Sequence, residues 1–438
     1  MTHDEDATWT PEIDGGAPAA RRQARDADEL PLHYTLGALQ QGADVRHRRE
    51  YNAAGAAYRG LAPAAMLRRV TDVRLDRICI VMMSAAGDTV HVLPVVNALK
   101  RYAPASRITW VLQPGPASLV QGHRSVDEIL HFDRARGWRA FADMRRALAG
   151  RAFDLVINLQ VYLKAGVITA LARAPMKLGF DRARARDLNW LVTTHRVPAR
   201  PPQHVQDQYF EFLQYLDVPH EPVVWDIGPW PNERAWQREF FSSFDRPAAP
   251  IVVATSKPEK DWLPERWAEV ADALWHDFGL EPVLVGGRSP RELRAEAAIV
   301  ARTGHKPRSA LGSGLRKLLS ILDGSALALS PDTGPLHMAV AVNRPVVSLM
   351  GYTNPKRTGP YRRFHDLIVD AYGEPGEDYP VSAAWRPGRM SRIRVRDVLD
   401  KVELWRTRYG KSSEERGEAP SVPPSSLRPP PSRKGPNS

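Results

Sequence analysis

The stretch Ala326–Ala341, ALALSPDTGPLHMAVA, decides the fold of this chain. It begins as a short apolar strand, stops at a polar turn and continues at once as a helix of small residues. In a parallel α/β sheet such a turn lies at the carboxyl end of a strand, where the first unpaired amides of the next helix face any bound ligand. The stretch predicts an anion-binding turn, although an ordinary capped helix explains the turn alone equally well.

The polar residues of this turn are candidate ligand contacts. Asp332 or Thr333 can cap the helix, Gly334 allows close approach to the backbone, and His337 lies about one helical turn further on. The tripeptide Asp332-Thr333-Gly334 also matches the aspartic protease signature, which needs an all-β setting and a second copy. The sequence has a single copy, followed by a helix-like segment, so we favour the anion-binding turn.

Length and composition predict a two-domain globular protein, since 438 residues with 43% hydrophobic residues exceed one typical core. The single cysteine, Cys79, lies in an apolar run and predicts a buried thiol rather than a disulfide or thiolate metal cluster. Residues 1–6 are acidic with no apolar segment behind them, and no apolar run approaches the roughly 20 residues of a membrane span. We expect a cytoplasmic protein.

The chain is basic, with a formal charge of +11 and a pI of about 9.8. This charge favours an acidic partner: nucleic acid, an anionic lipid surface or a phosphorylated substrate. Zinc-finger spacing, an RNP-like aromatic strand and a Walker lysine motif are all absent from the sequence. We therefore expect no nucleic-acid partner.

Strands and helices alternate along the chain from about Arg74, which predicts parallel sheets. The first run contains Ile78–Met83, Val92–Tyr102 (helix), Ile108–Leu112, Glu128–Phe132, Trp138–Leu148 (helix) and Leu155–Leu159. A proline-punctuated stretch over 224–247 predicts a domain boundary. The second run contains Ile251–Ala254, Glu265–Phe278 (helix), Pro282–Val285, Arg291–Ala301 (helix), Leu315–Leu322 (helix), Ala326–Leu329, Pro335–Val342 (helix) and Val346–Leu349.

Two Rossmann-like domains, 74–235 and 245–410, follow from this pattern, with a cleft between them. Residues 1–73 are predicted to be a partly helical or disordered extension, and 411–438 a disordered tail rich in proline and serine.

Three further strand-end loops carry polar residues. In the first domain, small residues at 84–87 precede Asp88, which can act as a general base on a hydroxyl or simply cap the next helix. In the second, Thr255, Ser256 and Lys260 can hold a diphosphate, or belong to a solvated loop. Gly286-Gly287 allows a nucleotide close to the backbone, and Glu292 can accept from ribose hydroxyls, although a Gly-Gly pair alone is a weak signal.

A group of polar and basic residues follows the last strands of the first domain. These side chains face an acidic acceptor if they line the cleft, or solvent if they do not. They are Gln160, Lys164, Arg182, Arg184 and Arg186.

In this order, the motifs resemble glycosyltransferase family 9, the ADP-heptose:lipopolysaccharide heptosyltransferases. The matching segments are Ser84–Pro94 (Ser-x-x-Gly-Asp-x-x-His-x-x-Pro), Lys260–Trp267, Asp332–His337 with Asn343–Val347, and Gly351–Tyr361. The likeness runs from about residue 77 to 404.

The resemblance implies a GT-B fold, with an acceptor domain followed by a donor domain, and an inverting transfer from ADP-heptose that needs neither metal nor other cofactor. It implies that Asp88 is the base, and that Lys260, with Thr255 and Ser256, binds the leaving diphosphate. It places Glu292 at the ribose and Asp332, Thr333 and Gly334 at the donor phosphate and sugar, with His337 beside them. It also places Lys164 and Arg186 at an anionic lipopolysaccharide acceptor, on a protein peripheral to the cytoplasmic face of the inner membrane.

Two departures lie near the expected donor site. Tyr352 and Asn354 stand in the common Gly-Pro-Thr-Asp-Pro motif, and Ala254-Thr255-Ser256 replaces a His-Pro-Gly-like opening. Three alternatives stay open: heptosyl transfer to protein hydroxyls, a non-catalytic relative that binds nucleotide sugar or lipopolysaccharide, and a nucleotide-sugar epimerase on the same fold. Retention of Asp88 argues against a pure binder.

Overall fold

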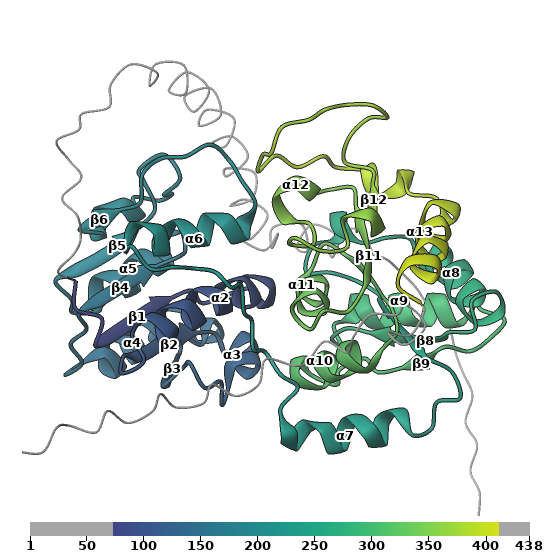
Figure 1. Ribbon diagram of the computed structural model, residues 1–438, viewed down its shortest axis with the longest axis horizontal. Helices are drawn as coiled ribbons and strands as arrows, with labels where there is room; N and C mark the ends of the chain where they lie inside the picture. The colour runs from purple at the N-terminus through teal and green to yellow at the C-terminus, as the bar shows by residue number, and fades with distance from the viewer. Residues whose placement is uncertain (1–72, 411–438) are drawn as a thin grey trace, which may run out of the picture. The chain divides into compact units, whose positions relative to one another are not determined.

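The computed structural model describes residues 73–410, which form two six-stranded sheets (Figure 1). Every pair of neighbouring strands is parallel. The predicted N-terminal extension, up to residue 72, and the predicted tail, 411–438, lie outside the described residues. The α/β class predicted from the strand and helix rhythm is confirmed.

The first sheet has the strand order β3-β2-β1-β4-β5-β6. Its strands are β1 (Arg77–Val81), β2 (Arg107–Leu112), β3 (Glu128–His131), β4 (Leu155–Asn158), β5 (Met176–Gly179) and β6 (His195–Arg196). Its α-helices are α2 (Ala86–Tyr102), α3 (Pro114–Val120), α4 (Arg139–Leu148), α5 (Leu163–Leu171) and α6 (Val205–Tyr215), with short 3₁₀ turns η2 (Arg134–Arg136) and η3 (Asn189–Val192).

The second sheet has the order β12-β11-β10-β7-β8-β9. Its strands are β7 (Ala248–Val252), β8 (Glu281–Val285), β9 (Arg308–Ser309), β10 (Ala328–Pro331), β11 (Val346–Met350) and β12 (Ile368–Asp370). The helices of this part are α7 (Pro231–Phe241), α8 (Pro264–His276), α9 (Pro290–Val300), α10 (Leu315–Gly324), α11 (Gly334–Ala341), α12 (Pro355–Thr358) and α13 (Val395–Arg408), with 3₁₀ turns η4 (Pro258–Lys260), η5 (His365–Leu367) and η6 (Arg389–Arg392).

Strand β1 shows why apolar runs fold as central strands. Successive side chains of a strand point to opposite faces, so a strand covered on both sides must be apolar throughout. Ile78 and Ile80 pack in one buried cluster, and Cys79 and Val81 in the other. The predicted burial of the Cys79 thiol is confirmed, and this burial raises its pKa to about 12.

The strand order identifies where each sheet can bind a ligand. In each sheet the chain runs outward to one edge, returns to the other side of the first strand, and so leaves a switch point beside that strand. The switch points lie between β1 and β4 in the first sheet and between β7 and β10 in the second. The loops that follow these four strands carry Asp88, Gln160, Lys260 and Asp332.

Several elements differ from the sequence predictions. Helix α2 begins at Ala86 rather than Val92, because its first turn consists of small and polar residues that lack an apolar period. Helix α7 lies within the stretch 224–247 that we expected to mark a domain boundary, where prolines obscure the helical pattern; Pro231 is its first residue, a position that tolerates proline. Helices α5, α6 and α13 were not predicted.

No helix within 73–410 is long and apolar enough to cross a membrane.

Candidate functional site

Asp88 lies in the first turn of α2 and is half-buried. Its Oδ2 accepts from the amide of Ala85 at 2.9 Å, and its Oδ1 accepts from the hydroxyl of Tyr209 on α6 at 3.1 Å. Burial raises the pKa of Asp88 above its ordinary value, although these two hydrogen bonds act in the opposite direction. Asp88 therefore does cap the helix, and it is also a carboxylate with increased basicity.

The first turns of α2 and α11 meet at two glycines, and the two helices pack together (Figure 1). A Cβ placed on Gly87 would lie 3.0 Å from Cδ2 of His337, and one placed on Gly334 would lie 3.1 Å from Cβ of Ala86. Both distances are tighter than ordinary contact, so a side chain at either position would require its neighbour to shift by a few tenths of an ångström. The arrangement brings Asp88, from the first sheet, next to His337 and Gly334, from the second.

Asp332, just before α11, is the centre of a buried polar network. Its Oδ2 accepts from Nζ of Lys260 at 2.7 Å, from Thr353 at 2.5 Å and from Thr358 at 3.3 Å. Its Oδ1 lies 3.7 Å from Nε2 of His337. Burial alone raises the pKa of Asp332, but the contact with His337 and the charge of Lys260 outweigh it and hold the pKa well below the ordinary range. Asp332 is a permanent anion that positions Lys260.

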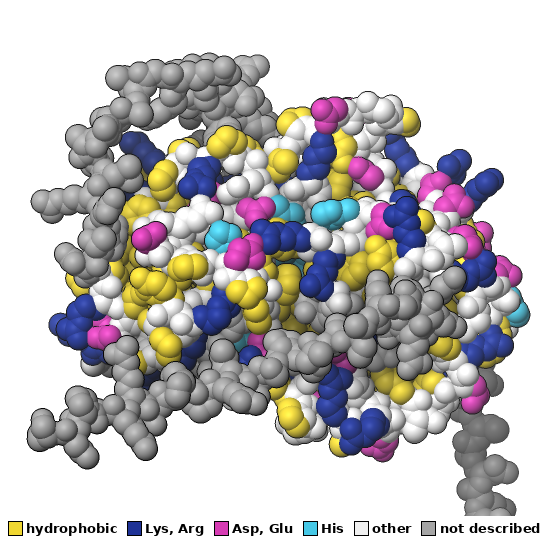
Figure 2. All heavy atoms as spheres, viewed as in Figure 1, with side chains coloured by type: hydrophobic (Ala, Val, Ile, Leu, Met, Phe, Trp, Pro, Cys, Tyr) yellow, Lys and Arg dark blue, Asp and Glu magenta, His cyan; other side chains and the backbone are white. Residues whose placement is uncertain are grey.

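Three histidines surround the junction of α2 and α11. The ring of His91 lies 4.3 Å from that of His337 and 5.8 Å from that of His204, measured between centroids. Burial lowers the pKa of His91 well below its ordinary value and that of His204 to about 4. These two imidazoles are neutral at neutral pH. Histidine side chains are visible near the middle of the face shown in Figure 2, among acidic and basic ones.

Two hydrogen bonds join α6 to the segment after α12. Nε2 of His204 donates to the carbonyl of Gly359 at 3.0 Å, and the hydroxyl of Tyr361 donates to Asp207 at 2.6 Å. The Nδ1 of His204 accepts from the amide of Gln206 at 3.1 Å, which fits a neutral ring protonated on Nε2. These two hydrogen bonds connect the part of the chain that contains the first sheet to the part that contains the second.

The loop after β7 is ordered by its own side chains. The hydroxyl of Thr255 donates to the carbonyl of Lys257 at 2.7 Å, and the amide of Thr255 donates to Asp261 at 2.6 Å. Ser256 is exposed. Thr333 is the residue that precedes α11, and its side chain makes no capping hydrogen bond. Of the three candidate residues in the loop after β7, Thr255, Ser256 and Lys260, it is Lys260 that hydrogen-bonds to Asp332.

Glu292 caps its own helix, α9. Its carboxylate accepts from the amide of Gly287 at 2.6 Å and from the amide and hydroxyl of Ser289 at 2.9 and 2.7 Å. These contacts hold the pKa of Glu292 below its ordinary value even though burial opposes them. A Cβ on Gly287 would lie 2.8 Å from this carboxylate, so a side chain there would force the Glu292 carboxylate to shift from its capping position.

The predicted acceptor residues occupy different settings. Gln160 accepts from the amide of Met83 at 3.1 Å and donates to the carbonyl of Ser84 at 2.9 Å, so it shapes the loop that carries Asp88. Lys164 is exposed on α5. The guanidinium carbon of Arg182 lies 4.6 Å from the ring centroid of Trp190, and that of Arg186 lies 5.9 Å from that of Tyr162.

Arg184 is a structural residue. It forms ion pairs with Asp181 and Glu211, and all three side chains are largely shielded from solvent. The sequence left two settings open for Arg184, an acidic acceptor or solvent. The solvent setting is wrong, because the carboxylates of Asp181 and Glu211 enclose the guanidinium.

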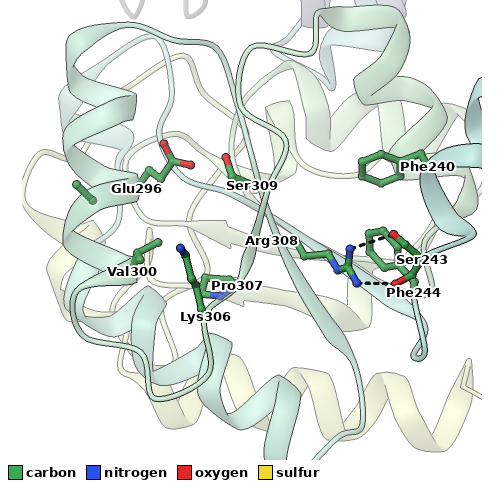
Figure 3. A pocket seen from close by; sticks show the side chains of 10 residues that line it. Phe240, Ser243, Phe244, Glu296, Val300, Lys306, Pro307, Arg308 and Ser309 are labelled. Atoms are coloured by element: carbon green, nitrogen blue, oxygen red, sulfur yellow. Dashed lines mark hydrogen bonds between the residues drawn. The ribbon is translucent and has the colours of Figure 1, made fainter.

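A separate hollow lies beside β9, at the edge of the second sheet furthest from β12 (Figure 3). Arg308 donates to the hydroxyl and the carbonyl of Ser243 at 3.0 and 2.6 Å, and its guanidinium carbon lies 4.2 Å from the Phe244 ring centroid. The lining residues include Phe240, Glu296, Val300 and Lys306. It contains none of the predicted site residues.

Several residues of the site were missed from sequence. Tyr209 contacts Asp88 although the two residues are 121 positions apart in the sequence, and no local sequence pattern predicts such a contact. Thr353 and Thr358 belong to the motif Gly351–Tyr361, but their role as donors to Asp332 was not predicted. Arg357, in the same motif, lies close enough for its positive charge to lower the pKa of Asp88.

Comparison with known proteins identifies the family. A sequence model of the family described as Glycosyltransferase family 9 (heptosyltransferase) matches residues 141–375, more than half of the chain. The chain belongs to glycosyltransferase family 9. It is a glycosyltransferase, so both the resemblance and the enzyme class predicted from the motifs are confirmed.

Relatives and solved structures agree with this assignment. The lipopolysaccharide core heptosyltransferase OpsX of Haemophilus influenzae is 29% identical over 336 residues, covering 74% of this chain and 96% of OpsX. Lipopolysaccharide heptosyltransferase 1 of Pseudomonas aeruginosa is 29% identical over 305 residues, covering 66% and 82%.

Two solved structures show the fold. The family 9 glycosyltransferase of Veillonella parvula has a TM-score of 0.65 at 23% identity, covering 76% of this chain and 98% of its own. The E. coli heptosyltransferase WaaC with ADP has a TM-score of 0.59 at 23% identity, covering 76% and 99%. The predicted GT-B fold is confirmed.

Proposed function

We propose that this glycosyltransferase moves a heptose from ADP-heptose to an inner-core lipopolysaccharide acceptor, with inversion at the transferred carbon. The curated relatives named above are lipopolysaccharide heptosyltransferases, and WaaC has been solved with ADP and with ADP-2-deoxy-2-fluoro heptose. The observation that carries the proposal is the half-buried carboxylate of Asp88, held by Tyr209 in the turn of α2 whose Gly87 approaches His337 on α11.

Asp88 acts on the acceptor side. The acceptor hydroxyl oxygen attacks C1 of the heptose, and its proton passes to the carboxylate of Asp88. The bond between C1 and the diphosphate oxygen breaks, and its electron pair leaves with ADP. Attack from the face opposite the diphosphate inverts the configuration at C1. The raised pKa of Asp88 suits this step, since a general base works best when its pKa approaches the working pH.

Lys260 acts on the donor side. Its ammonium, held by Asp332, offsets the charge that develops on the departing diphosphate. The amides at the first turn of α11 and the hydroxyl of Ser256 supply further donors. Thr255, whose hydroxyl donates to the carbonyl of Lys257, shapes this loop instead. In this proposal Gly287 and Glu292 contact the nucleoside, and the chemistry requires no further cofactor.

The acceptor lies on the first half of the molecule in this proposal. Its carboxylates and phosphates contact Lys164, Arg182 and Arg186. Gln160 shapes the neighbouring loop that leads to Asp88. The net charge of +11 supports a peripheral position at the cytoplasmic face of the inner membrane, which is anionic.

The test is incubation of the full chain with ADP-heptose, a panel of other nucleotide sugars and truncated lipopolysaccharide cores, followed by mass spectrometry. We expect a heptose-sized gain in mass on a core acceptor with ADP-heptose. No gain on any core, a product formed from the donor alone, or a gain confined to protein acceptors would each contradict the proposal.

A further inference from the structure

A solvent-facing aromatic group lies beside the donor loops of the second half. We call Tyr352, Trp385 and Lys257 the Trp385 platform. The rings of Tyr352 and Trp385 are stacked, with centroids 6.0 Å apart and planes 18° apart, and Nζ of Lys257 lies 4.3 Å from the Trp385 ring centroid. Of the two stacked rings, Trp385 is 42% exposed, whereas Tyr352 is only 6% exposed.

The position of Trp385 is fixed by backbone pairing. Thr353 and Trp385 form an antiparallel bridge, and the amide of Arg386 donates to the carbonyl of Tyr352 at 2.9 Å. The indole is therefore presented by a tethered segment and partly exposed, which is the arrangement of a preformed ligand contact.

The platform borders the Lys260–Asp332 pair. Thr353, next to Tyr352, donates to Asp332 at 2.5 Å. Lys257 lies in the same loop as Lys260, and burial together with the charge of Lys260 lowers its pKa. Both sides of the platform thus continue into the elements that would hold the donor diphosphate.

The sheet order distinguishes the sugar end of the donor from its base. The predicted nucleoside contacts Gly287 and Glu292 follow β8, on one side of β7. Tyr352 follows β11, which lies beyond β10 on the other side of β7. A nucleotide sugar whose diphosphate lies over β7 and β10 would direct its base toward β8 and its sugar toward β11.

We propose that the Trp385 platform binds the sugar of the nucleotide-sugar donor. The negative face of an indole attracts positively polarised groups, such as the C–H groups on one face of a pyranose, and here it also attracts the ammonium of Lys257, which lies over the ring. The inference rests on the proposed function.

The test compares calorimetric binding of ADP-heptose and of ADP to the full chain and to three variants. Trp385→Ala should weaken ADP-heptose binding about five- to ten-fold, with less than about a two-fold change for ADP. Trp385→Phe keeps an aromatic face and should recover most of the loss. The matched control is Trp138→Ala, which removes an indole that is 76% exposed on the first half and should change neither ligand.

Two outcomes would overturn the inference. Equal weakening of ADP and ADP-heptose by Trp385→Ala would show that the platform binds the base, and unchanged binding of both would remove it from the donor site. Heptose transfer by the unaltered chain is measured alongside. Its absence would overturn the proposed function itself, whereas normal transfer with unaffected Trp385→Ala binding would overturn the platform alone.

Discussion

Two aspartates, one after the first strand of the first sheet and one after β10 of the second, have pKa values shifted in opposite directions although they occupy similar positions. Asp88 and Asp332 both follow a central strand close to the start of a helix; Asp332 is buried and Asp88 is half-buried. The pKa of Asp88 is raised by burial, because its hydrogen-bond partners are an amide and a neutral hydroxyl. The pKa of Asp332 is lowered although this residue is the more buried of the two, because His337 and Lys260 outweigh the effect of burial.

The comparison teaches that the partner of a buried carboxylate, more than its burial, decides its chemistry. Two titratable groups whose environments separate their pKa values are a usual basis for dividing acid–base roles. Here Asp88 can accept a proton, whereas Asp332 stays ionised and orients a lysine.

Removing the base should have the largest effect. Asp88→Asn keeps the size of the side chain but cannot accept the acceptor proton, so heptosyl transfer should fall by roughly 10²–10⁴-fold while ADP-heptose binding is retained. Steady-state kinetics and calorimetry on the same preparation measure both quantities. Transfer within a few-fold of the unaltered chain would exclude Asp88 as the base.

Removing the lysine should affect both transfer and stability. Lys260→Met should lower transfer by roughly 10²–10³-fold. It also leaves Asp332 as a buried charge without its ion-pair partner, which should lower the free energy of unfolding by on the order of 3 kcal/mol.

The double variant Lys260→Met/Asp332→Asn separates these two effects. It should recover much of the stability in urea unfolding, because neither charge remains, but none of the transfer. Recovery of transfer in the double variant would show that Lys260 serves only to neutralise Asp332.

The depressed pKa of Asp332 predicts a component of acid sensitivity. A carboxyl whose pKa is lower in the folded state contributes stability that is complete above the unfolded value, about 3.9, and is lost as pH falls toward the folded value. Between about pH 5 and 3, the unfolding free energy of the unaltered chain should therefore fall more steeply than that of Asp332→Asn. Parallel curves from urea titrations at each pH would contradict this.

The smallest effect is expected for the hydrogen bond between Tyr361 and Asp207, which joins the segment after α12 to α6. Tyr361→Phe removes the hydroxyl that donates to Asp207 and should lower the unfolding free energy by about 1 kcal/mol. The matched control is Tyr379→Phe, which removes a tyrosine–carboxylate bond to Asp370 within the second half. Only Tyr361→Phe should also reduce transfer; equal transfer by both variants would deny that contact a functional role.

Sequence alone could propose candidates for this site because they lie in the loops and first helical turns that follow apolar strands. Parallel sheets bring their carboxyl ends to one edge, so Asp88, Lys260 and Asp332 could be chosen as candidates without coordinates. Helix α2 was placed six residues late, because Ala86 and Gly87 carry no apolar period.

What sequence could not supply were the pairings that set the chemistry. Lys260 and Asp332 are 72 positions apart, and Asp88 and Tyr209 are 121 apart. The opposite pKa shifts depend on these long-range contacts, as does the approach of α2 to α11. Asp332 was expected at the donor phosphate, and its neutralisation by Lys260 became visible only in the folded chain.

The most direct test of the central claim is an NMR titration of the chain labelled with ¹³C at the aspartate carboxyl carbons, with Asp88→Asn and Asp332→Asn used for assignment. We predict that Asp88 titrates above the ordinary value of about 3.9, and that Asp332 stays ionised to the lowest pH at which the protein remains folded. Titration of both carboxyls near the ordinary value, or of Asp332 above Asp88, would contradict the account.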